Sequence, residues 1–105
     1  MGVIKNVLRE ELENSLRLKE SYERELGKLP RGSLIRKLIK GHEYFYLVER
    51  REGKVRFAYR GKLSSKDVQE YSKAKESRAR YRRLLSQVKK QIRYLRSVLR
   101  GKQEV

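Results

Sequence analysis

Hydrophobic and polar positions divide this chain into three segments with different periodicities. In residues 3–28 the apolar positions lie along one side of a helix with 3.6 residues per turn, and they include Leu8, Leu12, Tyr22 and Leu26. Ser15 and Lys19 interrupt that side. Gly27 and then Pro30 are typical signals for the end of a helix. Cations and acids are equal in number in this segment, so we assign the helix a structural role.

Residues 32–62 are rich in β-branched and aromatic residues and contain two glycine turns, which predicts a three-stranded antiparallel sheet. We expect strands at 33–40, 43–50 and 54–60. Gly41-His42 suits a two-residue type II′ turn. A two-residue type I′ turn at Glu52-Gly53 would impose a positive φ on Glu52. A three-residue loop over 51–53 needs a positive φ only at Gly53, and it is the preferred prediction.

The second turn decides which side chains share a face of the sheet, because a shift of one residue exchanges the faces. The face expected to pack on the helices contains Leu34, Leu38, Phe45, Leu47, Val55, Phe57 and Tyr59. The opposite face is expected to present Lys37, Tyr44, Tyr46, Arg56 and Arg60, beside Ile35, Ile39, Val48 and Ala58. Interleaved rings and cations suit nucleic acid, since rings stack on bases and cations contact phosphates. Two interpretations of the tyrosines stay open, contact with nucleic acid or cover for a second helix, whereas the arginines favour binding.

Residues 65–100 form a second predicted helix with a heptad seam, whose members are Tyr71, Ala74, Arg78, Tyr81, Leu85, Val88, Ile92, Leu95 and Leu99. This helix is longer than the first. If the two pair antiparallel, the turns around Leu95 and Leu99 should overhang, which predicts a homodimer or a protein partner at this end. The expected fold is therefore α+β and a single domain over residues 1–105. It consists of a coiled-coil-like antiparallel helical hairpin with an inserted three-stranded sheet.

The formal net charge of +16 far exceeds the magnitude of about 2–8 that solubility requires of a small domain. It indicates a polyanionic partner, and the alternative is a soluble, lysine-rich helical protein. Between Glu76 and Glu104 the second helix contains no acid. We expect its basic stripe to follow phosphates, with the members Lys75, Arg82, Arg83, Lys89, Lys90, Arg93, Arg96 and Arg100.

Composition argues against several other classes of function. Hydrophobic residues make up 37% of the chain and charged residues 40%, so a large core is excluded. The absence of cysteine excludes disulfides and thiolate chemistry. His42 lies in a predicted turn without a second ligand or a nucleophile at suitable spacing. We therefore expect no catalytic residues, no metal site and no cofactor. No apolar run approaches the roughly 18 residues of a membrane span, and without a signal-peptide core the expected location is the cytoplasm.

The middle of the chain resembles a pattern found in uncharacterised small basic proteins of prokaryotes and their mobile elements, in which an LPxGS segment leads into glycine-turned, aromatic hairpins between two charged helices. The matching residues are Leu29, Pro30, Gly32, Ser33, Lys37, Ile39, Gly41, Tyr44, Phe45, Tyr46, Arg51, Glu52, Gly53, Lys54, Val55, Tyr59, Gly61 and Lys62. That family implies no settled activity. The hairpins are more weakly similar to the three-stranded arm-site DNA-binding domain of tyrosine recombinases, which implies a sheet placed in the major groove.

These patterns together predict a non-enzymatic nucleic-acid-binding protein. DNA of a mobile element, phage or plasmid is the first expectation, and RNA is the second because tyrosine-rich sheets also stack on unpaired bases. The alternative is a protein-interaction module, such as an antitoxin, inhibitor or adaptor, that binds an acidic partner.

Overall fold

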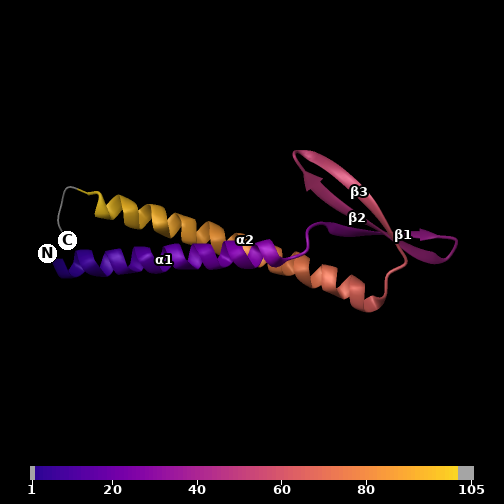
Figure 1. Cartoon of the computed structure of the whole chain (residues 1–105), viewed down its shortest axis with the longest axis horizontal. Coiled ribbons are helices and arrows are strands. Elements are labelled where there is room, and N and C mark those ends of the chain that lie inside the picture. The colour runs from indigo at the N-terminus through magenta and orange to yellow at the C-terminus, as the bar shows by residue number, and fades with distance from the viewer. Residues whose placement is uncertain (1, 102–105) are drawn as a thin grey trace. The chain divides into compact units, whose positions relative to one another are not determined.

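A computed structural model describes residues 2–101 of the protein (Figure 1). In chain order the elements are α1 (Gly2–Lys28), β1 (Ser33–Ile39), β2 (His42–Arg51), β3 (Lys54–Gly61) and α2 (Ser65–Leu99). The predicted α+β class is confirmed, and every element begins and ends within one residue of its expected bounds. Two compact units make up the described chain: a helical unit of residues 2–28 and 80–101, and a sheet unit of residues 29–79.

In the helical unit, α1 and the second part of α2 pack antiparallel. Gln91 Nε2 of α2 donates a hydrogen bond of 2.9 Å to Ser15 Oγ of α1. The rings of Tyr22 and Tyr81 meet at 6.2 Å between centroids, so a step forward along α1 corresponds to a step back along α2. Ser15 interrupts the apolar side of α1, yet it is almost fully buried, because its small side chain fits between the helices and its hydroxyl has a partner there.

The expected overhang at Leu95 and Leu99 is not observed. Leu95 is only 4% exposed, and Val88 and Ile92 are buried with it. Of the other seam residues, Leu85 and Leu99 are half-buried in the same unit. The additional length of α2 lies instead at its amino-terminal end, where residues 65–79 belong to the sheet unit.

Both turns of the sheet differ from prediction. Ile39 pairs with His42 around Lys40 (φ 50°) and Gly41 (φ 80°). Arg51 pairs with Lys54 around Glu52 (φ 52°) and Gly53 (φ 76°). Two central residues with positive φ define type I′ turns, so the predicted type II′ turn and the three-residue loop are wrong. At Glu52-Gly53 the two-residue turn prevails because its twist matches that of the strands, which outweighs a left-handed conformation that costs roughly 1–2 kcal/mol at a non-glycine residue. At the first turn, types I′ and II′ both match that twist, and the structure has type I′ with glycine second.

These turns decide which side chains share a face. The strand order is β1-β2-β3. The change of turn between β1 and β2 moves their pairing register by two residues, so the residues of β1 and β2 share faces as predicted. The change of turn between β2 and β3 moves their pairing register by one residue, so the side chains of residues 55–59 in β3 lie on the face opposite to the predicted one. Tyr46 pairs with Tyr59 and Val48 with Phe57, whereas Arg56 pairs with Glu49. The residues that change face are therefore Val55, Phe57, Tyr59, Arg56 and Ala58.

The covered face of the sheet carries Phe45 and Leu47, both of which are buried. The sheet unit is described in full, and the only helix in it is residues 65–79 of α2, whose Ala74 and Arg78 are buried as well. We call the face that carries Phe45 and Leu47 the covered face, because both side chains are buried. Tyr71, another seam residue, is half-buried in this unit.

Arg78 connects this part of α2 to the chain before β1. Its guanidinium donates hydrogen bonds to the carbonyl oxygen of Pro30 and, at 2.8 Å, to that of Gly32. Gly32 has a φ of 97°, and a Cβ there would lie 2.9 Å from both Leu47 Cδ1 and the Val48 carbonyl oxygen. Glycine at this position therefore lets the segment before β1 lie directly against β2, where Arg78 reaches it.

Arg78→Met should destabilise the protein by about 1–3 kcal/mol, because two partly buried carbonyl groups lose their donor. Chemical denaturation followed by circular dichroism measures this. Arg83→Met, at an exposed position of the same helix, is the control and should change stability by less than about 0.5 kcal/mol. Equal effects of the two substitutions would contradict the structural role of Arg78.

Glu52→Asn should stabilise the protein by about 0.5–1 kcal/mol, since asparagine tolerates the left-handed conformation better than glutamate does and so recovers part of its cost. The same denaturation experiment tests this. Arg50→Asn, at an extended position of β2, should give no gain. A destabilised Glu52→Asn variant would argue against the type I′ turn.

Candidate nucleic-acid interface

The sheet face opposite Phe45 and Leu47 is lined by aromatic and aliphatic side chains. We call it the aromatic face. It carries Ile35, Lys37, Ile39, Tyr44, Tyr46, Val48, Val55, Phe57 and Tyr59, together with Ser33, His42 and Arg50 at its margins. Tyr59 of β3 lies between two tyrosines of β2, with its ring centroid 5.3 Å from that of Tyr46 and 6.5 Å from that of Tyr44. Strand alternation in β2 and pairing with β3 therefore gather three tyrosine rings in one cluster.

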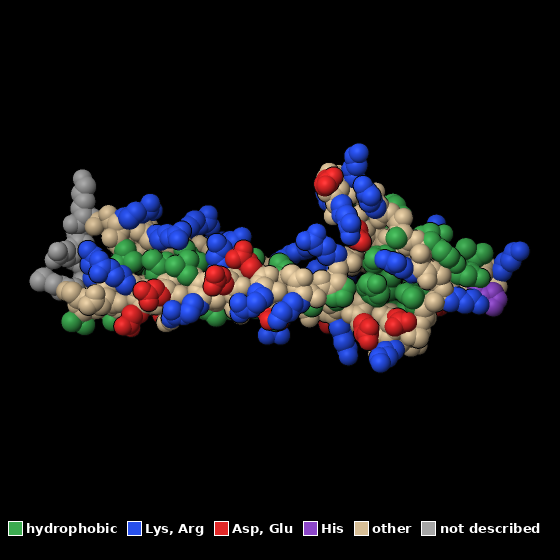
Figure 2. Space-filling view, in the orientation of Figure 1, with side chains coloured by type: hydrophobic (Ala, Val, Ile, Leu, Met, Phe, Trp, Pro, Cys, Tyr) green, Lys and Arg blue, Asp and Glu red, His purple; other side chains and the backbone are tan. Residues whose placement is uncertain are grey.

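The aromatic face is open in the described chain. Phe57 is 65% exposed and Tyr59 is 60% exposed, and Ile35 and Val55 are exposed beside them. Figure 2 shows hydrophobic side chains at the surface of the sheet unit. Exposed apolar side chains gathered on one face make this face a candidate interaction site.

Two lysines lie against the rings of this face. Lys37 Nζ is 5.2 Å from the centroid of the Tyr46 ring, and Lys62 Nζ is 6.0 Å from that of Tyr44. Both distances are within the range of a cation–π contact. The contacts hold the ammonium groups beside the rings, where they could meet an anion attached to a stacked planar group.

Carboxylates are excluded from the aromatic face. The acids of the three strands are Glu43 and Glu49, and both lie on the covered face with Phe45. There they form exposed ion pairs, Glu43 with Arg36 at 3.5 Å and Glu49 with Arg51 at 3.0 Å. The covered face therefore has charges of both signs at its margin, whereas the charged side chains of the aromatic face are all basic.

A small hollow of about 210 Å³ lies within the aromatic face. Ile35, Lys37, Tyr46 and Phe57 line it, so all three strands contribute. The hollow combines two aromatic rings with one cation, which suits a planar ligand that carries negative charge nearby.

The structure corrects the composition of the predicted sheet site. Lys37, Tyr44 and Tyr46 lie together on the aromatic face as expected, but Arg56 lies on the opposite face. Arg60 is exposed, next to the register shift at the end of β3. Sequence reasoning missed Phe57 and Tyr59 because the wrong loop at Gly53 turned them inward. The sequence contained a signal for the correct turn. Lys40-Gly41 and Glu52-Gly53 are both a charged residue followed by glycine, and both form the centre of a type I′ turn.

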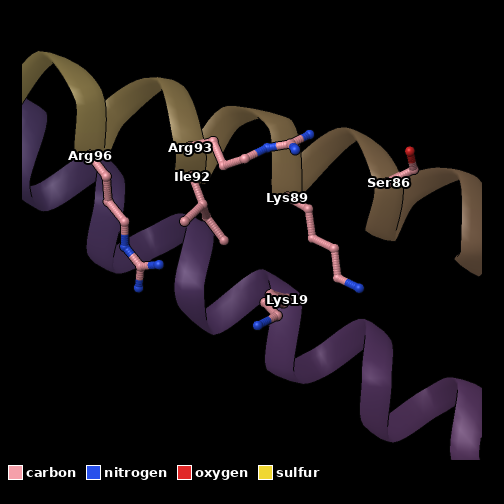
Figure 3. Close-up of a pocket in the computed structure, with 6 residues that line it drawn as sticks. All are labelled: Lys19, Ser86, Lys89, Ile92, Arg93 and Arg96. Carbon is pink, nitrogen blue, oxygen red and sulfur yellow. The ribbon is translucent and has the colours of Figure 1, made fainter.

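The predicted basic stripe of α2 is divided by the structure. Lys89, Arg93 and Arg96 line a second hollow of about 310 Å³ in the helical unit, together with Ser86, Ile92 and Lys19 of α1 (Figure 3). The other members, Arg82, Arg83, Lys90 and Arg100, are exposed outside it, and Lys75 belongs to the sheet unit. Lys19 was missed because α1 as a whole has balanced charges. Its position inside the interrupted apolar side was the signal that it faces α2.

Over residues 2–101 no three His, Asp or Glu side chains are grouped as a metal site would need. Within the same part of the chain, neither helix has an apolar stretch long enough to cross a membrane.

Comparison of the chain with protein-family models, with curated proteins and with solved structures found no match. The function is therefore argued from the geometry of these two surfaces.

Proposed function

We propose that this protein binds nucleic acid without catalysing a reaction, and that the aromatic face holds unpaired bases of DNA. The observation that carries the proposal is an uncovered sheet face with clustered rings, cations against those rings and no carboxylate. A setting in the DNA of a mobile element, phage or plasmid is part of the proposal through the sequence resemblance alone.

The chemistry of the face favours single strands over duplex. Base pairs in a duplex are already stacked on one another, so their flat faces are not accessible to Phe57 or Tyr59. Unpaired bases have free faces, and each base stacked on an aromatic side chain contributes about 1–3 kcal/mol. Lys37 and Lys62 are placed beside the rings, where phosphates of the same strand would pass.

A protein-interaction module is the second candidate, and the exposed apolar side chains are what favour it. Phe57 on the aromatic face and Leu38 on the covered face are both well exposed, and a protein partner could bury them. An acidic protein would also satisfy the net charge. The two candidate functions make different demands on the aromatic face. Binding of unpaired bases needs flat aromatic rings, whereas binding of a protein partner needs apolar volume.

The first test is Phe57→Ala, which should weaken binding of a labelled oligothymidylate about 5- to 150-fold, equivalent to about 1–3 kcal/mol for one stacked base. Fluorescence anisotropy measures the affinity. Phe57→Leu keeps most of the apolar volume but removes the ring, so it should lose a similar factor.

The matched control is Leu38→Ala, because Leu38 is 72% exposed, comparable with Phe57 at 65%, but lies on the other face. Its affinity for the oligonucleotide should be unchanged. Equal losses of affinity for Phe57→Ala and Leu38→Ala would contradict a binding role of the aromatic face. A single-stranded RNA and a duplex of the same length serve as competitors, and RNA bound more tightly than DNA would reassign the substrate.

The second test concerns salt. Lys37→Gln combined with Lys62→Gln should flatten the dependence of log K on log salt concentration by about 1.4, since each phosphate contact on a single strand contributes about 0.7. Arg36→Gln combined with Arg51→Gln removes the same charge from cations already paired with Glu43 and Glu49. That control should leave the slope nearly unchanged.

Weak and salt-insensitive binding to single strands, duplex and RNA alike would refute the nucleic-acid proposal and leave the interaction module.

A further inference from the structure

The hollow of the helical unit, which we call the basic groove, is defined by Lys19 of α1 and by Ser86, Lys89, Ile92, Arg93 and Arg96 of α2. We propose that the basic groove is a binding site for consecutive phosphate groups. This inference stands apart from the proposed function, because the groove and the aromatic face belong to different units and hold different chemical groups.

Both helices direct cations into the groove. Figure 3 shows Lys89 and Arg96 extending from α2 toward α1, with Lys19 on α1 between them, while Arg93 runs along α2. Ile92 is buried and forms an apolar floor, and Ser86 lies at one end. Antiparallel packing through Ser15 and Gln91, one turn away from Lys19, sets this geometry.

The size of the groove suits more than one phosphate. Its volume of about 310 Å³ is at the lower end of the range for small-molecule sites. Lys89 and Arg96 are separated by two helical turns, which is a rise of about 10 Å along α2. Cations spread over that distance match a linear anion better than a single compact one.

The choice of residue at position 19 is the main argument for a ligand. A carboxylate there would pair with the facing cations of α2 and stabilise the helix pair, as opposite charges flanking a coiled-coil seam do. Lysine occupies the position instead. Over residues 2–101 the ion pairs are Lys28–Glu25, Arg36–Glu43 and Arg51–Glu49, so none of the four cations of the groove has a carboxylate at ion-pair distance.

Four like charges around one hollow repel each other, and an anion removes that repulsion. A face that is merely solvated mixes both signs, and α1 itself does so along most of its length, whereas the groove does not. Arginine and lysine are typical ligands of phosphate groups, through forked and point contacts respectively. Consecutive phosphates occur both in a polynucleotide backbone and in free linear oligophosphates, and both present the same chemistry to the groove.

Sodium tripolyphosphate is the probe, since it has phosphates but no base that could use the aromatic face. Isothermal titration calorimetry with the whole protein should give saturable binding, and thermal melts should show a rise in Tm of several degrees that NaCl of equal ionic strength does not reproduce. Lys19→Glu should weaken the binding at least tenfold while leaving the Tm without ligand equal or higher. A gain in stability with a loss of binding separates a ligand site from a structural role.

Arg83→Glu is the matched control, because it makes the same change of charge on α2 outside the groove. Its affinity for tripolyphosphate should stay within about threefold of the original, since an exposed charge that does not contact the anion directly contributes little in water. Competition by oligothymidylate would identify the polynucleotide backbone as the source of the phosphates, and lack of competition would identify a free oligophosphate.

Equal weakening by Lys19→Glu and Arg83→Glu, or a Tm shift that NaCl reproduces, would overturn the site. If tripolyphosphate fails to bind while oligonucleotide binding still depends on Phe57, the groove inference alone is refuted. If tripolyphosphate binds and no polynucleotide does, the proposed function fails and the groove remains.

Discussion

Two hydrogen bonds from the Arg78 guanidinium, to the carbonyl oxygens of Pro30 and Gly32, join α2 to the chain before β1 within the sheet unit. They hold residues 65–79 of α2 against the segment that precedes β1, and Gly32 allows that segment to approach Leu47 and Val48 closely. Phe45 and Leu47 are buried on one face of the sheet. The opposite, aromatic face is open, since Phe57, Tyr59 and Val55 are all exposed on it.

Acidic residues are distributed so that two surfaces remain purely basic. In the sheet, Glu43 and Glu49 pair with cations on the covered face. In the helices, the acids of α1 do not line the groove, where Lys19 faces Lys89 and Arg96. Each arrangement gives up stabilising ion pairs that a single substitution could supply. Proteins commonly retain such unfavourable positions where binding requires them.

The two basic surfaces differ in chemistry. The aromatic face offers rings with cations beside them, which suits planar groups. The basic groove offers cations around an apolar floor, which suits phosphate alone. A polymer that has both bases and phosphates could use both surfaces, with stacking contributing an affinity that depends little on salt and phosphate contacts contributing the part that depends on it strongly.

The periodicity, the glycine positions and the charges of the sequence predicted the α+β class, the ends of every helix and strand to within one residue, and the net positive charge. All three properties depend on local spacing and composition. Tertiary structure decided the rest. The face of Phe57 and Tyr59 depends on whether the turn at Gly53 has two or three residues, a choice between small opposing energies of backbone strain and strand twist. The basic groove depends on which residue of α1 faces Lys89 and Arg96 of α2. Packing around Ser15 sets that alignment of the two helices, and Ser15 is far from Lys89 and Arg96 in the sequence.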